Sequence, residues 1–234
     1  MNPSLRRRCI AEAIITYVLV LIGCGAMVVE ADTHALSHAG VALTWGLVVM
    51  AMIYATGDLS GAHMNPAVSI ALVVLGRFRT SEAAVYVVAQ CIGATLAGLS
   101  LRAALPLNEA MLGATVISIA APAAWAVEFM MTAILMWVVM GVSSGPTDKP
   151  QIAGLAIGAT IAMEAMVAGP LTRASMNPAR SLGPAIAAAL PGELWIYLTA
   201  PVAGAIVGGW LFDCLRASDT QTEPSADAIE NETD

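Results

Sequence analysis

The sequence predicts an all-α membrane protein with six transmembrane helices and two re-entrant half-helices in an inverted repeat. Of its 234 residues, 58% are hydrophobic and only 12% are charged, whereas soluble domains carry about a quarter charged residues. The apolar residues form runs of roughly twenty, the length that crosses about 30 Å of hydrocarbon. In addition, the four residues Met-Asn-Pro-Ala occur twice, at 64–67 and at 176–179.

The long apolar runs predict six full spans, at about 9–29, 38–56, 82–102, 122–142, 151–168 and 194–214. The first span follows three arginines and resembles a signal peptide at its start. Because no convincing cleavage site follows, we expect it to be a membrane helix. The four cysteines show no CxxC spacing, so we expect packing roles and no metal site for Cys9, Cys24, Cys91 and Cys214.

Two shorter apolar stretches, 66–76 and 178–190, each follow an Asn-Pro pair. Asn caps free backbone N–H groups at a helix start, and Pro fits the first helical position. Stretches of eleven to thirteen helical residues rise only about 16–20 Å. Each is therefore expected to cross about half of the membrane.

The two halves of the chain also resemble each other in other ways. Residues 57–69 and 169–181, aligned without a gap, agree at eight of thirteen positions. In each half a Glu, Glu12 or Glu128, stands four residues before a Thr in the first span. Because each half has three spans, the second half must insert in the opposite orientation, which is the inverted-repeat pattern.

Two half-helices entering from opposite faces would meet near the midplane with their N-termini. Irregular backbone at that depth is tolerated only when it is buried in protein or lines a wet cavity. Helix N-termini carry partial positive charge and free N–H donors. The sequence thus predicts a narrow polar path with Asn65 and Asn177 at its centre.

The distribution of basic residues predicts the orientation of the chain. With six spans, most of the bases fall on one side: Arg6, Arg7, Arg8, Arg77, Arg79, Lys149 and Arg216. Basic loops favour the cytoplasm, so both termini are expected inside the cell (inner) membrane. Residues 217–234 hold six acids and no base, so we expect 215–234 to be a disordered acidic tail that aids solubility or, alternatively, recruits a partner.

Two Asn-Pro-Ala boxes in inverted halves resemble the aquaporin, or major intrinsic protein, family over about residues 1–214. The resemblance implies one channel domain with repeats at about 9–103 and 122–214, and a pore in each subunit of a homotetramer. It also implies a pore centre formed by both boxes: Asn65, Pro66, Ala67, Asn177, Pro178 and Ala179. Glu12, Glu128 and His63 would support the loops near the boxes, although the two Glu residues are also candidates for a proton relay.

In this family four positions set the narrowest point of the pore, and here they hold Trp45, Ala165, Ala174 and Arg180. This set, together with 168–170, 181–185 and 195–197, resembles the nodulin-26-like branch. That resemblance implies passage of glycerol, urea-like solutes, boric acid and arsenous acid. The short chain without plant-style extensions suggests a bacterial relative.

Arg180 is expected to donate hydrogen bonds to solute hydroxyls and to repel cations, because its guanidinium keeps its charge. Its alternative role is to hold the second box segment in shape through loop carbonyls. Trp45 is expected to form an apolar wall of the pore. Trp45 also has an alternative role, as an interface anchor.

Four residues remain open from the sequence. Arg173 replaces a small residue, and it either widens the positive field at the outer mouth or simply faces solvent. Glu164 lies in an apolar span, where it could pair with an Arg or lie at an interface. His34 and His38 are spaced four apart, which leaves a weak alternative of metal binding.

The sequence therefore predicts a passive channel for small neutral solutes and water that excludes ions and protons. It predicts no catalysis and no cofactor, and no nucleic-acid partner. One alternative is a mainly water-selective channel. Another is a proton-coupled secondary transporter with Glu12, Glu128 and Glu164 as proton sites, since such transporters also use inverted repeats.

Overall fold

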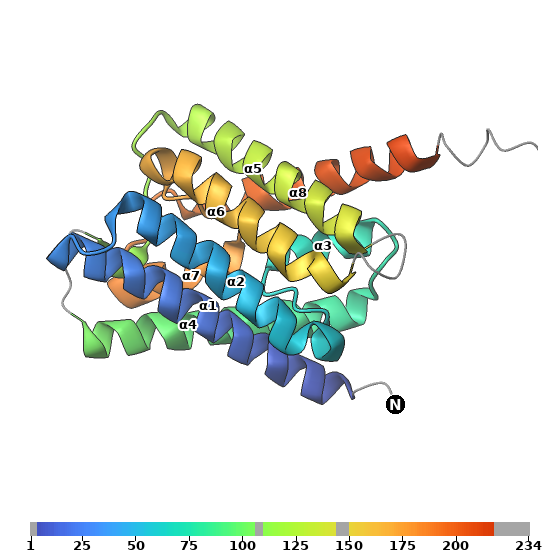
Figure 1. Cartoon of the computed structure of the whole chain (residues 1–234), viewed down its shortest axis with the longest axis horizontal. Helices are drawn as coiled ribbons and strands as arrows, with labels where there is room; N and C mark the ends of the chain where they lie inside the picture. Colours follow the sequence, from blue (N-terminus) through green and yellow to red (C-terminus); the bar gives the residue numbers. More distant parts are fainter. Residues whose placement is uncertain (1–3, 106–109, 144–149, 218–234) are drawn as a thin grey trace, which may run out of the picture.

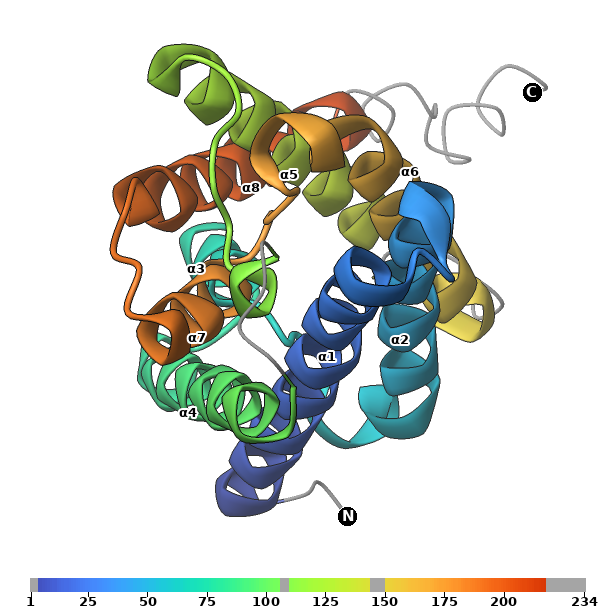
Figure 2. The same cartoon turned by 90° about the vertical axis from the view of Figure 1, so that its left-hand side faces the viewer.

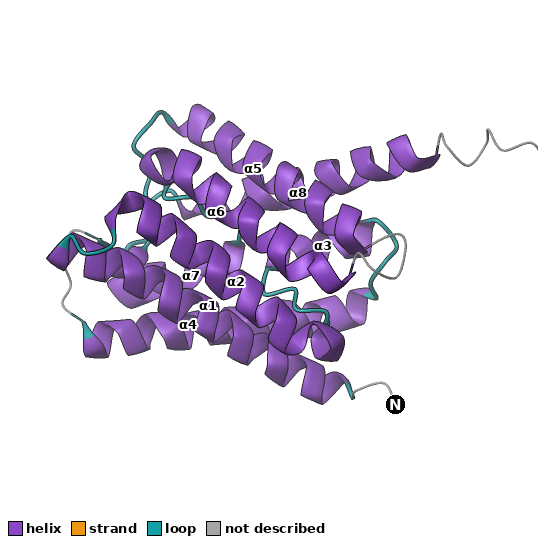
Figure 3. Cartoon of the chain, viewed as in Figure 1, coloured by secondary structure: helices purple, strands orange, loops and turns teal. Residues whose placement is uncertain are grey.

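The computed structural model describes residues 4–105, 110–143 and 150–217, and these residues form helices and loops without strands (Figure 3). Six long apolar helices have the length and composition of membrane spans. They are α1 (Leu5–Thr33), α2 (Ser37–Ser60), α4 (Thr80–Ala104), α5 (Ala121–Ser143), α6 (Ala153–Thr172) and α8 (Leu194–Ala217). The predicted all-helical membrane fold is confirmed.

Two short helices lie between the long ones, α3 (Pro66–Val74) and α7 (Pro178–Ala188). Each begins at an Asn-Pro pair, as the pattern predicts. The Asn65 side chain accepts a hydrogen bond from the Ala67 N–H at 2.9 Å. The Asn177 side chain accepts from the N–H groups of Ala179 and Arg180 at 3.0 and 3.3 Å. Both N-terminal ends are thus capped by their own box.

The long helices extend a few residues beyond most of the expected spans. The first begins at Leu5 instead of about residue 9, because the three arginines continue the helix. Its end is set by His34, whose backbone takes the left-handed conformation with φ of 53°. The second ends at Gly61, where φ is 84°, a conformation that glycine adopts at little cost.

The long helices cross in pairs, with α1 against α4, α2 against α6 and α5 against α8. Seen end-on, the two short helices lie between α4 and α8 on one side of the bundle, with α2 and α6 on the other side (Figure 2). Two crossings are close because they place glycines against backbone. A Cβ on Gly93 of α4 would collide with the Ala13 carbonyl of α1, and a Cβ on Gly204 of α8 with that of Phe129 of α5.

The short helices approach each other from opposite ends of the bundle and meet near its middle (Figure 1). The start of α1 and the end of α8 lie at the same end of the bundle. Two expectations fall outside the described residues: the disorder of the acidic tail beyond Ala217, and the position of Lys149.

A channel-like cavity and its constriction

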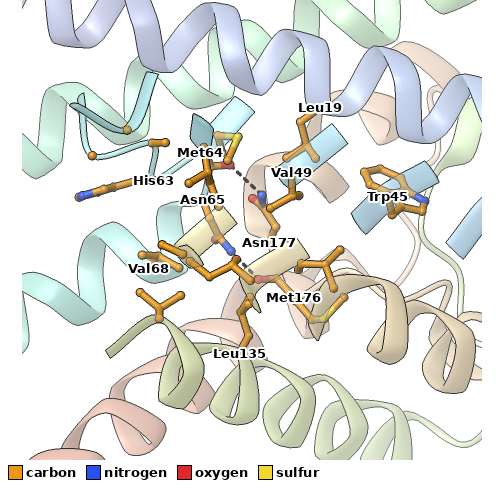
Figure 4. Close-up of a pocket in the computed structure, with 18 of the residues that line it drawn as sticks. Leu19, Trp45, Val49, His63, Met64, Asn65, Val68, Leu135, Met176 and Asn177 are labelled. Carbon is orange, nitrogen blue, oxygen red and sulfur yellow. Dashed lines mark hydrogen bonds between the residues drawn. The ribbon is translucent and has the colours of Figure 1, made fainter. Parts of the chain in front are cut away.

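A cavity of about 760 Å³ runs along the centre of the bundle past both boxes. The side chains around its middle come from α1, α2, α3, α5 and the two box segments (Figure 4). Most are apolar, including Leu19, Val49, Val68 and Leu135. Polar side chains line the cavity at the boxes and at Arg180, and Tyr54, Asp58, Ser143 and Gln151 add further polar groups to its lining.

The two box asparagines tie the box segments to each other. Asn65 Nδ2 donates to the Met176 carbonyl at 2.7 Å, and Asn177 Nδ2 donates to the Met64 carbonyl at 2.8 Å (Figure 4). An amide nitrogen carries two N–H donors. Each asparagine therefore keeps a second N–H after making this reciprocal bond, and both asparagines line the cavity.

The prolines and alanines of the boxes lie behind the asparagines. All four are buried, and the described residues that line the cavity do not include them: Pro66, Ala67, Pro178 and Ala179. These four residues form the first turns of the two short helices and pack the helices together.

The four side chains expected at the narrowest point lie together at one part of the cavity. Trp45, Ala165, Ala174 and Arg180 all line it. The Arg180 guanidinium carbon lies 4.5 Å from the centroid of a Trp45 ring, a cation–π geometry. Trp45, Ala165 and Ala174 also line a second cavity of about 60 Å³. These three side chains therefore separate the two spaces.

Arg180 is almost fully buried and has several hydrogen-bond partners. Its Nη1 donates to the Gly113 carbonyl at 2.7 Å. Its Nη2 donates to the Met27 sulfur at 3.3 Å and to the Arg173 carbonyl at 3.4 Å. Its Nε has no partner among the described residues. The guanidinium thus binds the backbone at Gly113 and Arg173, and its Nε–H has no acceptor among the described residues.

Arg173 does not simply face solvent, so that expectation is wrong. Its Nη1 donates to the carbonyls of Ala110 and Ala114 at 2.8 and 3.1 Å. These residues flank the short 3-10 turn η1 (Met111–Gly113), which carries the carbonyl that Arg180 binds. Two arginines therefore fasten one loop beside the constriction.

Glu12 of α1 binds the first box segment. Its carboxylate accepts from Ser60 Oγ at 2.7 Å, from the N–H groups of His63 and Met64 at 3.0 and 2.8 Å, and from Gln90 Nε2 at 2.9 Å. These donors come from the end of α2, from the loop before α3 and from α4. An intramembrane carboxylate is tolerated when it is paired in this way.

Glu128 of α5 binds the second box segment in the same manner. It accepts from Thr172 Oγ1 at 2.7 Å and from the N–H groups of Ser175 and Met176 at 2.9 and 2.8 Å. Each Glu thus holds its box segment through backbone donors, the arrangement expected of loop support.

His63 lines the cavity at the end away from Trp45. Its ring Nδ1 lies 3.0 Å from Ser69 Oγ. The ring packs edge-on against Phe78 and Tyr86, with centroids 4.9 and 5.2 Å away. The contact with Ser69 and the two aromatic rings therefore hold the His63 ring in one orientation.

Three further residues left open by the sequence have distinct positions. Glu164 of α6 is buried, and neither carboxyl oxygen has a hydrogen-bond partner among the described residues, so it does not pair with an arginine. His38 Nε2 lies 2.8 Å from the Met166 carbonyl, and His34 ends α1.

Several residues that shape the site were not predicted from the sequence. Gln90, Gly113 and Met27 contact Glu12 or Arg180 from distant helices or loops, and no short-range pattern signals such contacts. Tyr86 and Tyr197 have similar positions in the sequence, because each lies early in the last span of its half. This similarity indicates that the two residues are equivalent. Their hydroxyls donate to the carbonyls of Ser60 and Thr172, both at 2.9 Å.

Comparison with known proteins agrees with this architecture. The family model described as Major intrinsic protein matches residues 1–212. Aquaporin NIP1-2 of Oryza sativa subsp. japonica is 43% identical, covering 90% of this chain and 72% of its own. Nodulin-26 of Glycine max is 41% identical, covering 91% and 79%.

Among solved structures, the chain resembles the X-ray structure of the aquaglyceroporin from Plasmodium falciparum. The TM-score is 0.82 at 26% identity, covering 94% of this chain and all of that one. Members of the family are channels and not enzymes. With a central cavity, two facing boxes and relatives of this kind, the chain belongs to the major intrinsic protein family of multi-pass membrane channels.

Proposed function

We propose that this chain is a passive channel for small uncharged solutes, among them glycerol and metalloid acids such as boric and arsenous acid, as well as for water. The proposal rests on the constriction that Trp45, Ala165, Ala174 and Arg180 form in the cavity. Two of its four side chains are alanines, which are much smaller than the neighbouring Trp45 and Arg180 side chains. Its nodulin-26-like relatives and its aquaglyceroporin structural neighbour support a path for solutes larger than water.

The chemistry of the path suits neutral solutes with hydroxyl groups. The Arg180 guanidinium, which lines the cavity, and the second N–H of each box asparagine can replace hydrogen bonds that the solute makes to water. The Trp45 ring offers an apolar wall to the remaining face of the solute. An ion would lose its hydration shell without adequate compensation. Arg180 and the two helix N-termini add a positive field that opposes cations and protons.

The assembly and orientation belong to the same proposal. We place the channel domain in residues 1–214, with one pore in each subunit of a homotetramer and the acidic segment 215–234 as a cytoplasmic tail. The basic residues at the start of α1 and between α3 and α4 support a cytoplasmic location for both termini. The membrane is the cell (inner) membrane.

Stopped-flow light scattering on proteoliposomes tests the proposal. Vesicles are mixed with a hyperosmotic solution of glycerol or boric acid, so that they first shrink as water leaves and then reswell as solute enters. We expect reswelling to be faster than in protein-free vesicles. Rapid shrinkage followed by reswelling at the protein-free rate would contradict the solute channel and indicate a mainly water-selective one.

A further inference from the structure

The Arg180 guanidinium has one tightly bound side and one loosely bound side. Its Nη1 donates to the Gly113 carbonyl at 2.7 Å, and this hydrogen bond is buried. Its Nη2 donates to the Met27 sulfur at 3.3 Å and to the Arg173 carbonyl at 3.4 Å, and these two hydrogen bonds are only partly buried. Because Nε is buried as well, the hydrogen bonds of Nη2 are the most accessible ones of this guanidinium.

Both acceptors of Nη2 are weak. A thioether sulfur accepts hydrogen bonds only weakly. N–H···O hydrogen bonds usually measure about 2.7–3.2 Å, so the bond from Nη2 to the Arg173 carbonyl is long. Nη2 carries two N–H groups, and neither has a strong acceptor among the described residues. An oxygen atom of a solute can therefore replace the Met27 sulfur at little cost.

Met27 reaches Arg180 across the constriction. It lies in the C-terminal part of α1, is half-buried and lines the small cavity of about 60 Å³ together with Trp45, Ala165 and Ala174. Arg180 lines the large cavity. The contact between Met27 and Arg180 therefore spans the boundary between the two cavities, and a solute that moves from one cavity to the other passes beside this contact.

We propose that Met27 is a further selectivity residue of the pore and that its sulfur is an exchangeable acceptor for Arg180. Before a solute arrives, the sulfur occupies one N–H of Nη2. A solute hydroxyl oxygen then takes this N–H, because it is a stronger acceptor than a thioether, and the sulfur gives way. The inference rests on the proposed function, since it concerns how the constriction passes solutes with hydroxyl groups.

The side chain of residue 27 should control how readily Arg180 releases this N–H. Methionine is unbranched and has three rotatable bonds, so it can move aside within a narrow space. Leucine has nearly the same volume but no acceptor, so a solute would not have to displace one. Glutamine is also unbranched, but its amide oxygen is a full acceptor that would hold Nη2 against the solute. Solute permeability should therefore be highest in Met27→Leu, intermediate in wild type and lowest in Met27→Gln.

Stopped-flow light scattering on proteoliposomes tests this order with glycerol. Met27→Gln should lower glycerol permeability by about fivefold relative to wild type, the effect of one neutral hydrogen bond that the solute must displace. Met27→Leu should raise it by about twofold or more, because the weaker hydrogen bond to sulfur is no longer broken. Met130→Leu makes the same substitution at an exposed methionine of α5 and should keep the wild-type value.

A packing role for Met27 would give a different result, since both substitutions would then lower glycerol permeability. That outcome, or equal permeability in wild type and both variants, would overturn the proposal. The thermal stability of each purified variant is measured as well, and if Met27→Gln is destabilised, the rise in Met27→Leu alone decides.

The same vesicles separate this inference from the proposed function. If wild type passes glycerol no faster than protein-free vesicles, the proposed function fails. The order of the three proteins in water permeability then decides the inference, because a water oxygen also accepts from Nη2. Water permeability that is lower in Met27→Leu than in wild type would overturn it.

Discussion

At the scale of single residues, the constriction depends both on the side chains that line it and on the residues that pack behind those side chains. Trp45 can lie beside the pore because Gly23 of α1 leaves space for its ring. A Cβ on Gly23 would collide with three carbon atoms of that ring. Arg180 is positioned in the same indirect way, by the Gly113 carbonyl and the Met27 sulfur.

Gly23→Ala would place a methyl group against the Trp45 ring. The added methyl group should push the Trp45 ring away from α1 and into the cavity, because the core between them is already filled. We expect lower glycerol flux and a loss of about 1–3 kcal/mol in stability, as for other overpacked sites. Stopped-flow reswelling and thermal denaturation measure the two effects.

Gly25→Ala is the matched control in the same helix. There the new Cβ would lie 3.5 Å from Leu101 Cδ2, an ordinary contact. Flux and stability should stay close to wild type. Equal effects of the two substitutions would show that the space behind Trp45 does not control the constriction.

Arg173→Ala removes two hydrogen bonds that fasten the η1 loop. Because each bond ends on a loop carbonyl, the loop should loosen by about 1–3 kcal/mol and release the carbonyl that orients Arg180. We expect reduced thermal stability and a less selective channel, with a lower ratio of glycerol to urea flux. Arg79→Ala, at an exposed position, serves as the control, and a selectivity change of the same size in both variants would contradict this role.

At the scale of elements, the helices were largely predictable and the loops were not. The repeated Asn-Pro pairs predicted both short helices because capping is a local effect of adjacent residues. The η1 turn and its bonds to Arg173 and Arg180 depend on contacts between segments about 60 residues apart. Gln90 was missed for the same reason, since nothing near it in the sequence marks it as a partner of Glu12.

The close helix crossings lead to a prediction about glycines. Gly93→Ala and Gly204→Ala should separate α1 from α4 and α5 from α8, because each Cβ would meet a backbone carbonyl that cannot move aside easily. We expect each to cost about 1–3 kcal/mol. The readout is the temperature at which the detergent-purified protein loses its monodisperse form.

Gly141→Ala of α5 provides the comparison, because its Cβ would lie 3.7 Å from Phe212 Cε2. Alanine is also the better helix former by about 1 kcal/mol. This variant should be as stable as wild type or more so. If Gly93→Ala and Gly204→Ala behaved like it, the crossings would not depend on backbone contact.

At the scale of the whole molecule, the bundle surrounds one fixed cavity with paired boxes. The boxes are bound to each other and to Glu12 and Glu128. Both carboxylates are occupied by loop donors, which suits a static path better than a carrier that must change partners. We therefore predict that an imposed proton gradient drives no uphill accumulation of glycerol in proteoliposomes. Accumulation above the outside concentration would contradict a passive channel and favour a coupled transporter.

The small side chains of Ala165 and Ala174 are expected to admit solutes larger than water past Trp45 and Arg180. The most direct test measures the ratio of glycerol to water permeability in proteoliposomes containing wild type, Ala174→Phe or Ala84→Phe. Ala84 lies on an exposed face of α4, so its variant controls for the added ring. We predict that Ala174→Phe lowers the ratio severalfold while Ala84→Phe leaves it unchanged. Equal losses of glycerol and water flux in Ala174→Phe would contradict the claim, because Ala174 would then not discriminate between them.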